Sequence, residues 1–318
     1  MSETTEPRVQ TPGRAQEVTA LSQKAKKTRS LWSNALRQYR RHTLAMAGTI
    51  VLLIIVLAVL FGPMLWPKDP FAFSFAESYK GVSLSHPMGT DDLGHDTFAR
   101  VLWGGRVSIA VGIVAMLVAI ILGTLIGAVA GYFGGFIDSA LMRLTDLFIS
   151  LPELPLLLVV IYLFQDTMKN RFGILIGTFV LIVGIIGALR WMTVARLVRA
   201  EFLSVKEKEY IEAAHSIGVS TPSIIFKHIL PNTLSPVIVA ATLAVASAII
   251  TESTLSFLGL GFPPDIPTWG RLLNNANDFI QIAPHMVIFP GMAIFVTVLC
   301  INYVGDGLRD ALDPRHTI

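Results

Sequence analysis

One group of ionisable side chains in this sequence has the types and spacing of a metal site. Asp91, Asp92, His95 and Asp96 lie close together, and imidazole and carboxylate groups ligate divalent metal ions. The alternative is a structural one, in which this acidic segment forms an elbow in a polar loop. No Ser/His/Asp or Cys/His pair stands in a context typical of hydrolysis. The single cysteine, Cys300, allows neither an intramolecular disulfide nor a cysteine-based zinc cluster.

Three carboxylates lie inside strongly apolar segments, namely Asp146, Glu153 and Glu252. An unpaired ionised group in such a place is expensive in a membrane, by about 2 to 3 kcal/mol or more. One use for these groups is a proton relay in an ion-coupled secondary carrier. A structural explanation is also open: Glu252 is protonated or hydrogen-bonded by neighbouring hydroxyls, and Asp146 pairs with Arg143, one helical turn away.

The composition places these groups in a membrane protein. The chain has 318 residues, of which 53% are hydrophobic and 15% are charged, and its mean hydropathy is +0.62. Soluble domains carry about 25% charged residues. Several apolar windows reach the roughly 20 residues that a helix needs to cross a bilayer, and the short alternating segments of a β-barrel are missing from the sequence. We therefore expect an all-α integral membrane protein.

The basic residues indicate orientation rather than a nucleic-acid partner. The net charge is +3 and the pI is about 9.0, but nine of the 25 Lys and Arg residues precede Thr43. Such clustering marks the cytoplasmic side of a first crossing. Residues 1–30 are predicted to form a disordered cytoplasmic tail, without the apolar core of a signal peptide. Residues 31–42 are predicted to form an amphipathic segment on the inner membrane surface.

Six transmembrane helices are predicted, at residues 43–65, 107–130, 137–164, 172–194, 234–258 and 284–304. Pro152 and Pro155 should kink the third. Residues 165–171 are predicted to be a short outer loop. No internal repeat is apparent in the sequence, which weakens the reading as an inverted-repeat secondary transporter.

These crossings divide the rest of the chain between the two sides of the membrane. Residues 66–106 form an external segment, residues 107–304 a transmembrane core, and residues 305–318 a cytoplasmic tail. Both termini are then cytoplasmic. The loop between crossings four and five, residues 196–232, faces the cytoplasm as well.

The first half of this loop has the pattern of a short amphipathic helix. Ile211, Ala214 and Ile217 recur at helical spacing. Gly218 stands where a C-terminal cap glycine with positive φ belongs.

A second short helix should follow it. Ser220 or Thr221 is the expected N-cap, with Pro222 at the first helical position, and Pro231 should separate this helix from the next crossing.

Such a helix pair has three plausible uses. A helix-turn-helix that reads DNA has similar spacing, but the second helix offers only Lys227 and His228 as long donors. A plug for the groove of a partner protein would present Glu212 to a basic residue. A plain connector that packs against two crossings is the third. The residue pattern alone leaves plug and connector equally open.

The segment "EAAHSIGVSTPSIIFKHILPN" resembles the cytoplasmic coupling loop of permease subunits in binding-protein-dependent ABC importers. The family pattern is EAA, three residues, Gly, nine residues, Ile, any residue and Leu-Pro. His228 stands at the Ile position, as is usual in the peptide-type branch. The positions that match are Glu212, Ala213, Ala214, Gly218, Leu230 and Pro231.

The resemblance covers all but about the first 30 residues and is to the C-type subunit of the dipeptide, oligopeptide and nickel branch. "HPMGTDDLGHDTFARVLWGGRVSIAVG" is similar to a family segment, with His95 where Arg is more usual. "GYFGGFIDSALMRLTDLFISLP", "TESTLSFLGLGFPPDIPTWGRLL" and "GDGLRDALDP" are similar to further family segments.

The resemblance implies a type I ABC importer permease in the bacterial inner membrane, carrying peptides or other small solutes. It implies four kinds of partner: a second homologous permease subunit, two cytoplasmic ATPase subunits, an external solute-binding protein and the lipid bilayer, with no nucleic acid. Glu212 would pair with a basic residue of the ATPase, Ala213 and Ala214 would allow close approach, and Gly218 would turn the chain. Glu252 is a possible residue of the translocation pathway.

The sequence contains no G-x-x-x-x-G-K-[ST] phosphate loop. ATP and magnesium are accordingly expected on the partner ATPase, and this chain is expected to be a non-catalytic subunit without a cofactor or metal of its own. An ion-coupled carrier remains the alternative. Transport that survives vanadate but collapses with an uncoupler would favour that carrier.

Overall fold

The computed structural model describes residues 31–312, so the predicted tail 1–30 and the last six residues lie outside it. Most of the described residues are helical, and none of them forms a β-strand. Five helical stretches are long and apolar enough to span a membrane. They are α3 (Thr43–Leu65), α4 (Thr97–Phe133), α7 (Ile174–Lys206), the stretch Thr221–Phe257 that ends in α10 (Leu230–Phe257), and α12 (His285–Leu312).

The third predicted crossing, residues 137–164, corresponds to two helices rather than one. α5 (Gly135–Ser150) and α6 (Glu153–Phe172) pass the test for a membrane span only as a pair, and they are bent by 87° at the break between them. The prolines explain the break, because Pro152 is the N-cap of α6 and cannot donate a backbone hydrogen bond. The predicted outer loop at 165–171 is wrong, since α6 continues through it, with Lys169 Nζ donating to Gln165 Oε1 at 3.1 Å.

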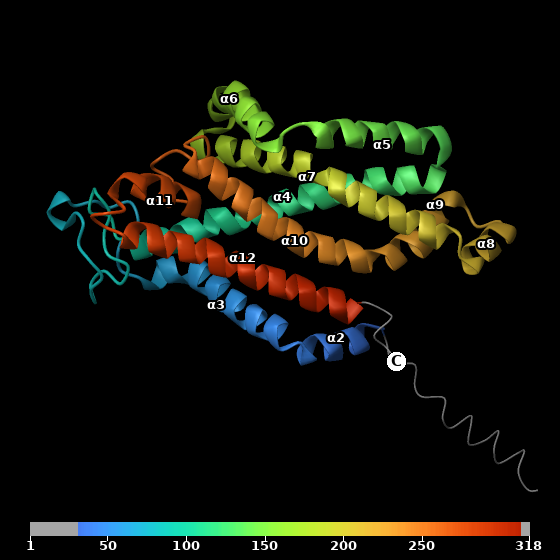
Figure 1. The fold of residues 1–318 in the computed structure, drawn as a ribbon, viewed down its shortest axis with the longest axis horizontal. Helices are drawn as coiled ribbons and strands as arrows, with labels where there is room; N and C mark the ends of the chain where they lie inside the picture. Colours follow the sequence, from blue (N-terminus) through green and yellow to red (C-terminus); the bar gives the residue numbers. More distant parts are fainter. Residues whose placement is uncertain (1–30, 313–318) are drawn as a thin grey trace, which may run out of the picture.

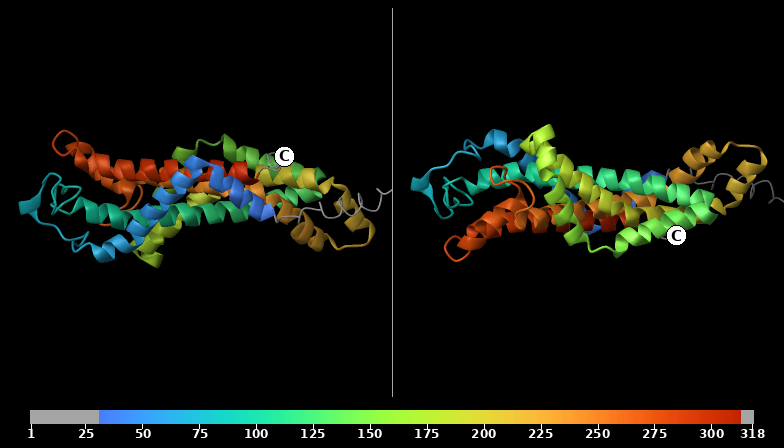
Figure 2. Two further views of the ribbon diagram at one scale, coloured as in Figure 1. Left: turned by 90° about the horizontal axis from the view of Figure 1, so that it is seen from below. Right: turned by 90° about the horizontal axis from the view of Figure 1, so that it is seen from above.

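The helices form an elongated bundle with connecting segments at both ends (Figure 1). At one end lie α11 (Trp269–Ala276) and the segment between α3 and α4, which we call the outer end. At the other lie α8 (Glu209–Ser216) and α9 (Thr221–Ser223), which we call the α8 end. The two views of Figure 2 show the same separation.

The first helix of the described chain, α2 (Leu31–Arg41), packs beside the last one. Gln38 Nε2 donates to the Asp310 carbonyl oxygen at 2.8 Å, and His42 lies 3.6 Å from the Asp310 carboxylate. α2 and the end of α12 therefore lie together, on the side of the bundle toward the α8 end (Figure 1).

α4 and α7 approach closely along a row of glycines on α4. A Cβ atom on Gly123 would lie 2.7 Å from the Trp191 carbonyl oxygen, and one on Gly127 would lie 2.5 Å from that of Ala195. Small residues four apart are the usual means by which two membrane helices bring their backbones together. This pair of helices forms the centre of the bundle and fixes the position of the α8 end of α7.

α4 begins at Thr97, ten residues before the predicted start at 107. Asp96 caps the helix by accepting from the Ala99 N–H at 2.8 Å. The prediction missed this stretch because Arg106 makes it polar. The structure gives that charge a partner: Arg106 Nε donates at 2.9 Å to the Val59 carbonyl oxygen. Pro63, four residues further along α3, has no N–H with which to satisfy that carbonyl.

Candidate functional site

α8 ends in a glycine cap, as predicted. Gly218 has φ of +79°, its N–H donates to the His215 carbonyl oxygen at 3.0 Å, and the Val219 N–H donates to that of Ala214 at 3.1 Å. This pair of hydrogen bonds defines a Schellman motif, in which a residue with positive φ reverses the chain. Gly218 thus turns the loop sharply after two helical turns.

The inner face of the loop is anchored in a buried apolar cluster. Ile211 and Ile224 are fully buried, one on each side of the Gly218 turn. They belong to a cluster that reaches into α4, α7 and α10, with Tyr132, Val194, Val198, Phe202, Val205, Ile229 and Val237 as its other buried members. The loop is therefore packed onto the bundle and not merely tethered by its ends.

The opposite face of the loop carries Glu212, Ala213 and several exposed apolar side chains. Glu212 and Ala213 are exposed, whereas Ala214 is buried. The prediction that Ile217 shares the buried face is wrong: its side chain is 81% exposed, because α8 ends at Ser216 and the chain turns away there. Phe226 is 62% exposed as well. A carboxylate among exposed large apolar side chains is typical of a surface that a partner covers.

The second half of the loop is continuous with the following span, which corrects the predicted separation at Pro231. α9 leads into a π-helical turn, Ile224–Ile229, and Leu230 and Pro231 then open α10 directly. Proline cannot donate its own hydrogen bond and its ring crowds the carbonyl four residues earlier. A π-helical turn directly before Pro231 widens the backbone where that crowding would occur. No free recognition helix for DNA remains in this part of the described chain.

Two polar contacts fix the end of α7 that leads into α8. Arg199 forms an ion pair with Asp138 of α5, with Nη2 to Oδ2 at 2.6 Å. Lys206 Nζ donates to the Tyr132 carbonyl oxygen at 2.6 Å and lies 5.3 Å from the centre of the Tyr132 ring. The base of the loop is thereby joined to both α4 and α5.

Glu252 is fully buried in α10, among hydroxyl groups. Ser256 Oγ donates to one carboxylate oxygen at 2.7 Å, and Ser108 Oγ of α4 donates to the other at 3.1 Å. Ser108 Oγ also accepts from the Trp269 N–H at 3.3 Å, so the carboxylate links α4, α10 and α11. This arrangement matches the structural explanation, with the carboxyl group held by hydroxyls. Its role in a translocation pathway stays a prediction.

The two other carboxylates of the apolar segments pair with arginines of α7. Asp146 pairs with Arg196, so the predicted pair with Arg143 is wrong. Glu153 Oε1 lies 2.8 Å from Arg190 Nη2. Sequence reasoning missed Arg190, although an arginine within an apolar run, "GALRWM", is the signal that points to such a residue.

At the outer end, the acidic segment forms a network with basic partners. Asp91 Oδ2 lies 2.6 Å from Arg100 Nη1 and 2.8 Å from His95 Nδ1. Asp96 Oδ2 contacts His86 Nδ1 at 2.9 Å, away from Asp91. Burial by itself would raise the pKa of Asp91, but the hydrogen bond from His95 and the charge of Arg100 outweigh it and lower the pKa. These contacts fit the structural elbow.

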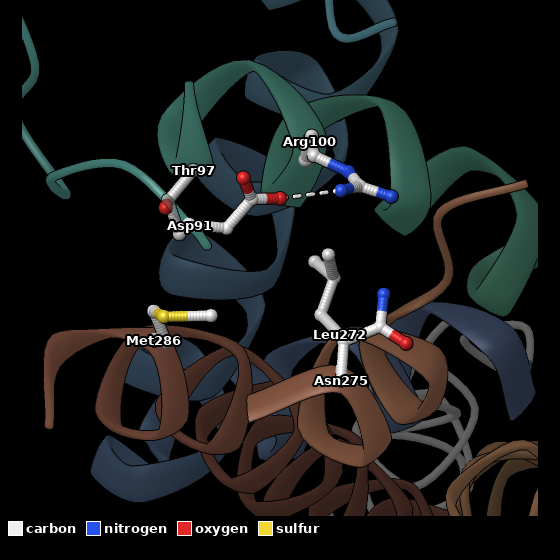
Figure 3. Close-up of a pocket in the computed structure, with 6 residues that line it drawn as sticks. All are labelled: Asp91, Thr97, Arg100, Leu272, Asn275 and Met286. Carbon is white, nitrogen blue, oxygen red and sulfur yellow. Dashed lines mark hydrogen bonds and ion pairs between the residues drawn. The ribbon is translucent and has the colours of Figure 1, made fainter. Parts of the chain in front are cut away.

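The hollow beside this network is too small for a solute. Figure 3 shows the Asp91–Arg100 pair and Thr97 above Leu272, Asn275 and Met286. The space they enclose is about 10 Å³, which is room for about one water molecule. Within residues 31–312, no group of three or more His, Cys, Asp or Glu side chains has the arrangement of a metal site.

The chain resembles known transport proteins over most of its length. The family described as "Binding-protein-dependent transport system inner membrane component" matches residues 123–318, and "N-terminal TM domain of oligopeptide transport permease C" matches residues 30–82. The chain is 43% identical over 289 residues to the oligopeptide transport system permease protein OppC of Escherichia coli K12, covering 90% of this chain and 92% of that protein.

Other relatives have the same extent. The dipeptide transport system permease protein DppC of Alkalihalophilus pseudofirmus is 37% identical, with 90% of each chain covered. The glutathione transport system permease protein GsiD of Shigella flexneri is 39% identical, covering 92% of this chain and 93% of that protein.

A solved structure shares the fold. The MetNI methionine ABC transporter, in an inward-facing conformation, matches with a TM-score of 0.53 and 18% identity, covering 67% of this chain and 96% of that chain. Together with the helical spans, these likenesses place the protein in the inner membrane as a multi-pass chain. The chain belongs to the family of binding-protein-dependent transport system inner membrane components.

Proposed function

We propose that this chain is the permease subunit of an ATP-driven ABC importer for peptides or similar small solutes. It forms half of the translocation pathway with a second homologous subunit. Relatives named for oligopeptide, dipeptide and glutathione transport support the substrate class. The observation that carries the mechanism is the loop at the α8 end, whose Glu212 face is exposed while its other face is anchored in the bundle.

The anchored loop acts as a mechanical joint. From Thr221 to Phe257 the chain forms 37 residues of nearly continuous helix, about 55 Å at 1.5 Å per residue. A partner that moves α9 therefore moves the start of a membrane span. α8 is joined to the same unit through Ile211 and Ile224, so both halves of the loop shift together. A charge-assisted contact from Glu212 to a basic residue of the partner would contribute about 1.5 to 3 kcal/mol.

The proposed partners follow from the two ends of the bundle. Two ATPase subunits, which bind ATP and magnesium, cover the α8 end, and this chain is non-catalytic. The α8 end and both termini are then cytoplasmic. An external solute-binding protein meets the outer end, where Phe73 and Phe75 are exposed beside each other with ring centres 5.6 Å apart. Exposed aromatic pairs are good anchors for a protein partner.

Affinity purification from the native membrane tests the assembly. The tagged chain is solubilised in mild detergent, copurifying chains are identified by mass spectrometry, and ATP hydrolysis is measured. We expect ATPase subunits and a homologous permease with the wild type, and their loss with Glu212→Arg. Glu207→Arg makes the same charge reversal at an exposed position outside α8 and should retain them. Purification of the wild-type chain alone, without ATP hydrolysis, would refute the proposal.

A further inference from the structure

A cavity of about 160 Å³ lies where α5 ends and α6 begins. Its lining combines apolar side chains with one ion pair: Glu153 Oε1 of α6 lies 2.8 Å from Arg190 Nη2 of α7. Arg190 stands at the midpoint of α7, which has 33 residues. It also lies within the crossing predicted at residues 172–194, four residues before its end, so the charged pair stands in the membrane-spanning part of α7 toward the α8 end.

Three helices converge on this ion pair. Besides Glu153, Arg190 Nη2 donates to Thr251 Oγ1 of α10 at 3.0 Å. A guanidinium carries five N–H donors, and these contacts use only the Nη2 group. Among the described residues, none accepts from Arg190 Nε. Because Nε is buried, the donors that these contacts leave for a ligand are those of Nη1, and three helices fix the position of the arginine.

The pair is only partly covered by this chain. The side chain of Glu153 is 42% exposed and that of Arg190 is 31% exposed. Ionised groups that face lipid near the bilayer centre are strongly disfavoured, so such groups face protein or a water-filled cavity. Two further ion pairs, Asp146–Arg196 and Asp138–Arg199, join α5 to α7 between this point and the α8 end. A polar face therefore runs from this ion pair toward the α8 end.

We propose that this cavity is a binding site of the translocation pathway that takes a peptide by its terminal carboxylate at Arg190, whose guanidinium Glu153 holds in position. The inference rests on the proposed transport function. Peptides of different sequence share only their main chain and termini, so a site that serves many of them must use those groups. Arginine binds a carboxylate through parallel N–H donors, which gives both strength and orientation.

Thiol labelling tests whether the cavity is wet. Cys300 is the only cysteine, so Cys300→Ala gives a cysteine-free chain. Thr193→Cys then places a thiol in the cavity lining, and Ile54→Cys places one near the midpoint of α3, at a site 60% exposed in this chain. The whole transporter, in proteoliposomes, is treated with a charged, water-borne methanethiosulfonate reagent. Because the thiolate is the reactive form, we expect the cavity cysteine to react at least about tenfold faster than the α3 cysteine.

Peptide protection tests recognition of the terminal carboxylate. Trialanine should slow labelling of Thr193→Cys, whereas N-acetyl-trialanine amide should not. Arg190→Gln should abolish the protection and Arg190→Lys should keep part of it. Arg196→Gln, the same change in the neighbouring ion pair outside the cavity lining, should leave it intact.

Three results would overturn the inference: a cavity cysteine as slow as the α3 control, equal protection by the free and the blocked peptide, or full protection in Arg190→Gln. Failure of the proposed function looks different. A transporter that takes up peptide in an ATP-dependent way but shows any of these three results keeps its function and loses this site. Protection by trialanine in a chain that purifies without ATPase partners would keep this site and refute the proposed function.

Discussion

Replacing Ile211 with alanine tests whether the buried face of α8 holds the loop in place. Ile211 is fully buried in the cluster beneath the loop. Truncating a buried isoleucine to alanine costs about 2 to 5 kcal/mol. α8 has only eight residues, too few to be stable without packing, so we expect this loss to undock α8 and leave the bundle intact.

The magnitude follows from the lower of these values. At about 1.4 kcal/mol per tenfold change, 2 kcal/mol raises the undocked population roughly 30-fold. Trypsin reports that population, because Lys206 ends α7, Lys208 directly precedes α8 and cleavage follows the open fraction when opening is fast. The rate of cleavage at these lysines is measured by mass spectrometry on the purified chain in detergent. We expect Ile211→Ala to raise this rate by about the same factor as the undocked population.

Ile217→Ala is the matched control. It removes the same atoms from a side chain that is 81% exposed, one residue beyond the end of α8. Cleavage should stay at the wild-type rate. If Ile211→Ala cleaves no faster than this control, the loop is not held by its apolar face and cannot act as a joint between ATPase and span.

Three further predictions concern the glycine cap of α8, the hydrogen bonds of Glu252 and the contacts of Asp91. Gly218→Ala places a Cβ at φ of +79°, which costs about 1 to 2 kcal/mol, so ATPase subunits should copurify less with this variant. Glu252→Ala should lower the melting temperature in detergent more than Glu252→Gln, because it leaves the hydroxyls of Ser108 and Ser256 unpaired at about 1 to 3 kcal/mol. Burial by itself would raise the pKa of Asp91, but its contacts with His95 and Arg100 lower it. The stabilisation from Asp91 is then fully present above about pH 3.9 and lost as the pH falls through the lower folded-state pKa, so Arg100→Gln should move the acid limb of a melting-temperature profile to higher pH.

Apolar run length predicted most of the fold, because a span must bury its backbone in about 20 residues of helix. It failed where prolines and charges interrupt the run. Pro152 and Pro155 indicated a kink, but their spacing does not distinguish a kink from the observed bend of 87°. The start of α4 was missed because Arg106 looks polar in sequence, while in the fold it completes the hydrogen bonding of α3.

The sequence predicted where the coupling loop turns, but it predicted only partly which of the loop's side chains are buried and which are exposed. Gly218 predicted the C-terminal cap of α8, since few residues other than glycine adopt positive φ readily. The exposure of Ile217 depends on where α8 stops, and helical periodicity cannot show that. The partners of Asp146 and Glu153 come from α7, so no local rule could pair these carboxylates with Arg196 and Arg190.

The central claim is that ATP hydrolysed on partner subunits drives transport through the Glu212 loop. The most direct test is uptake of labelled trialanine by proteoliposomes that contain the whole transporter and its binding protein. The account predicts accumulation that requires ATP, is blocked by vanadate, survives an uncoupler and is abolished by Glu212→Arg. Uptake that collapses with the uncoupler, and that proceeds equally well without ATP and in Glu212→Arg, would contradict it and favour an ion-coupled carrier.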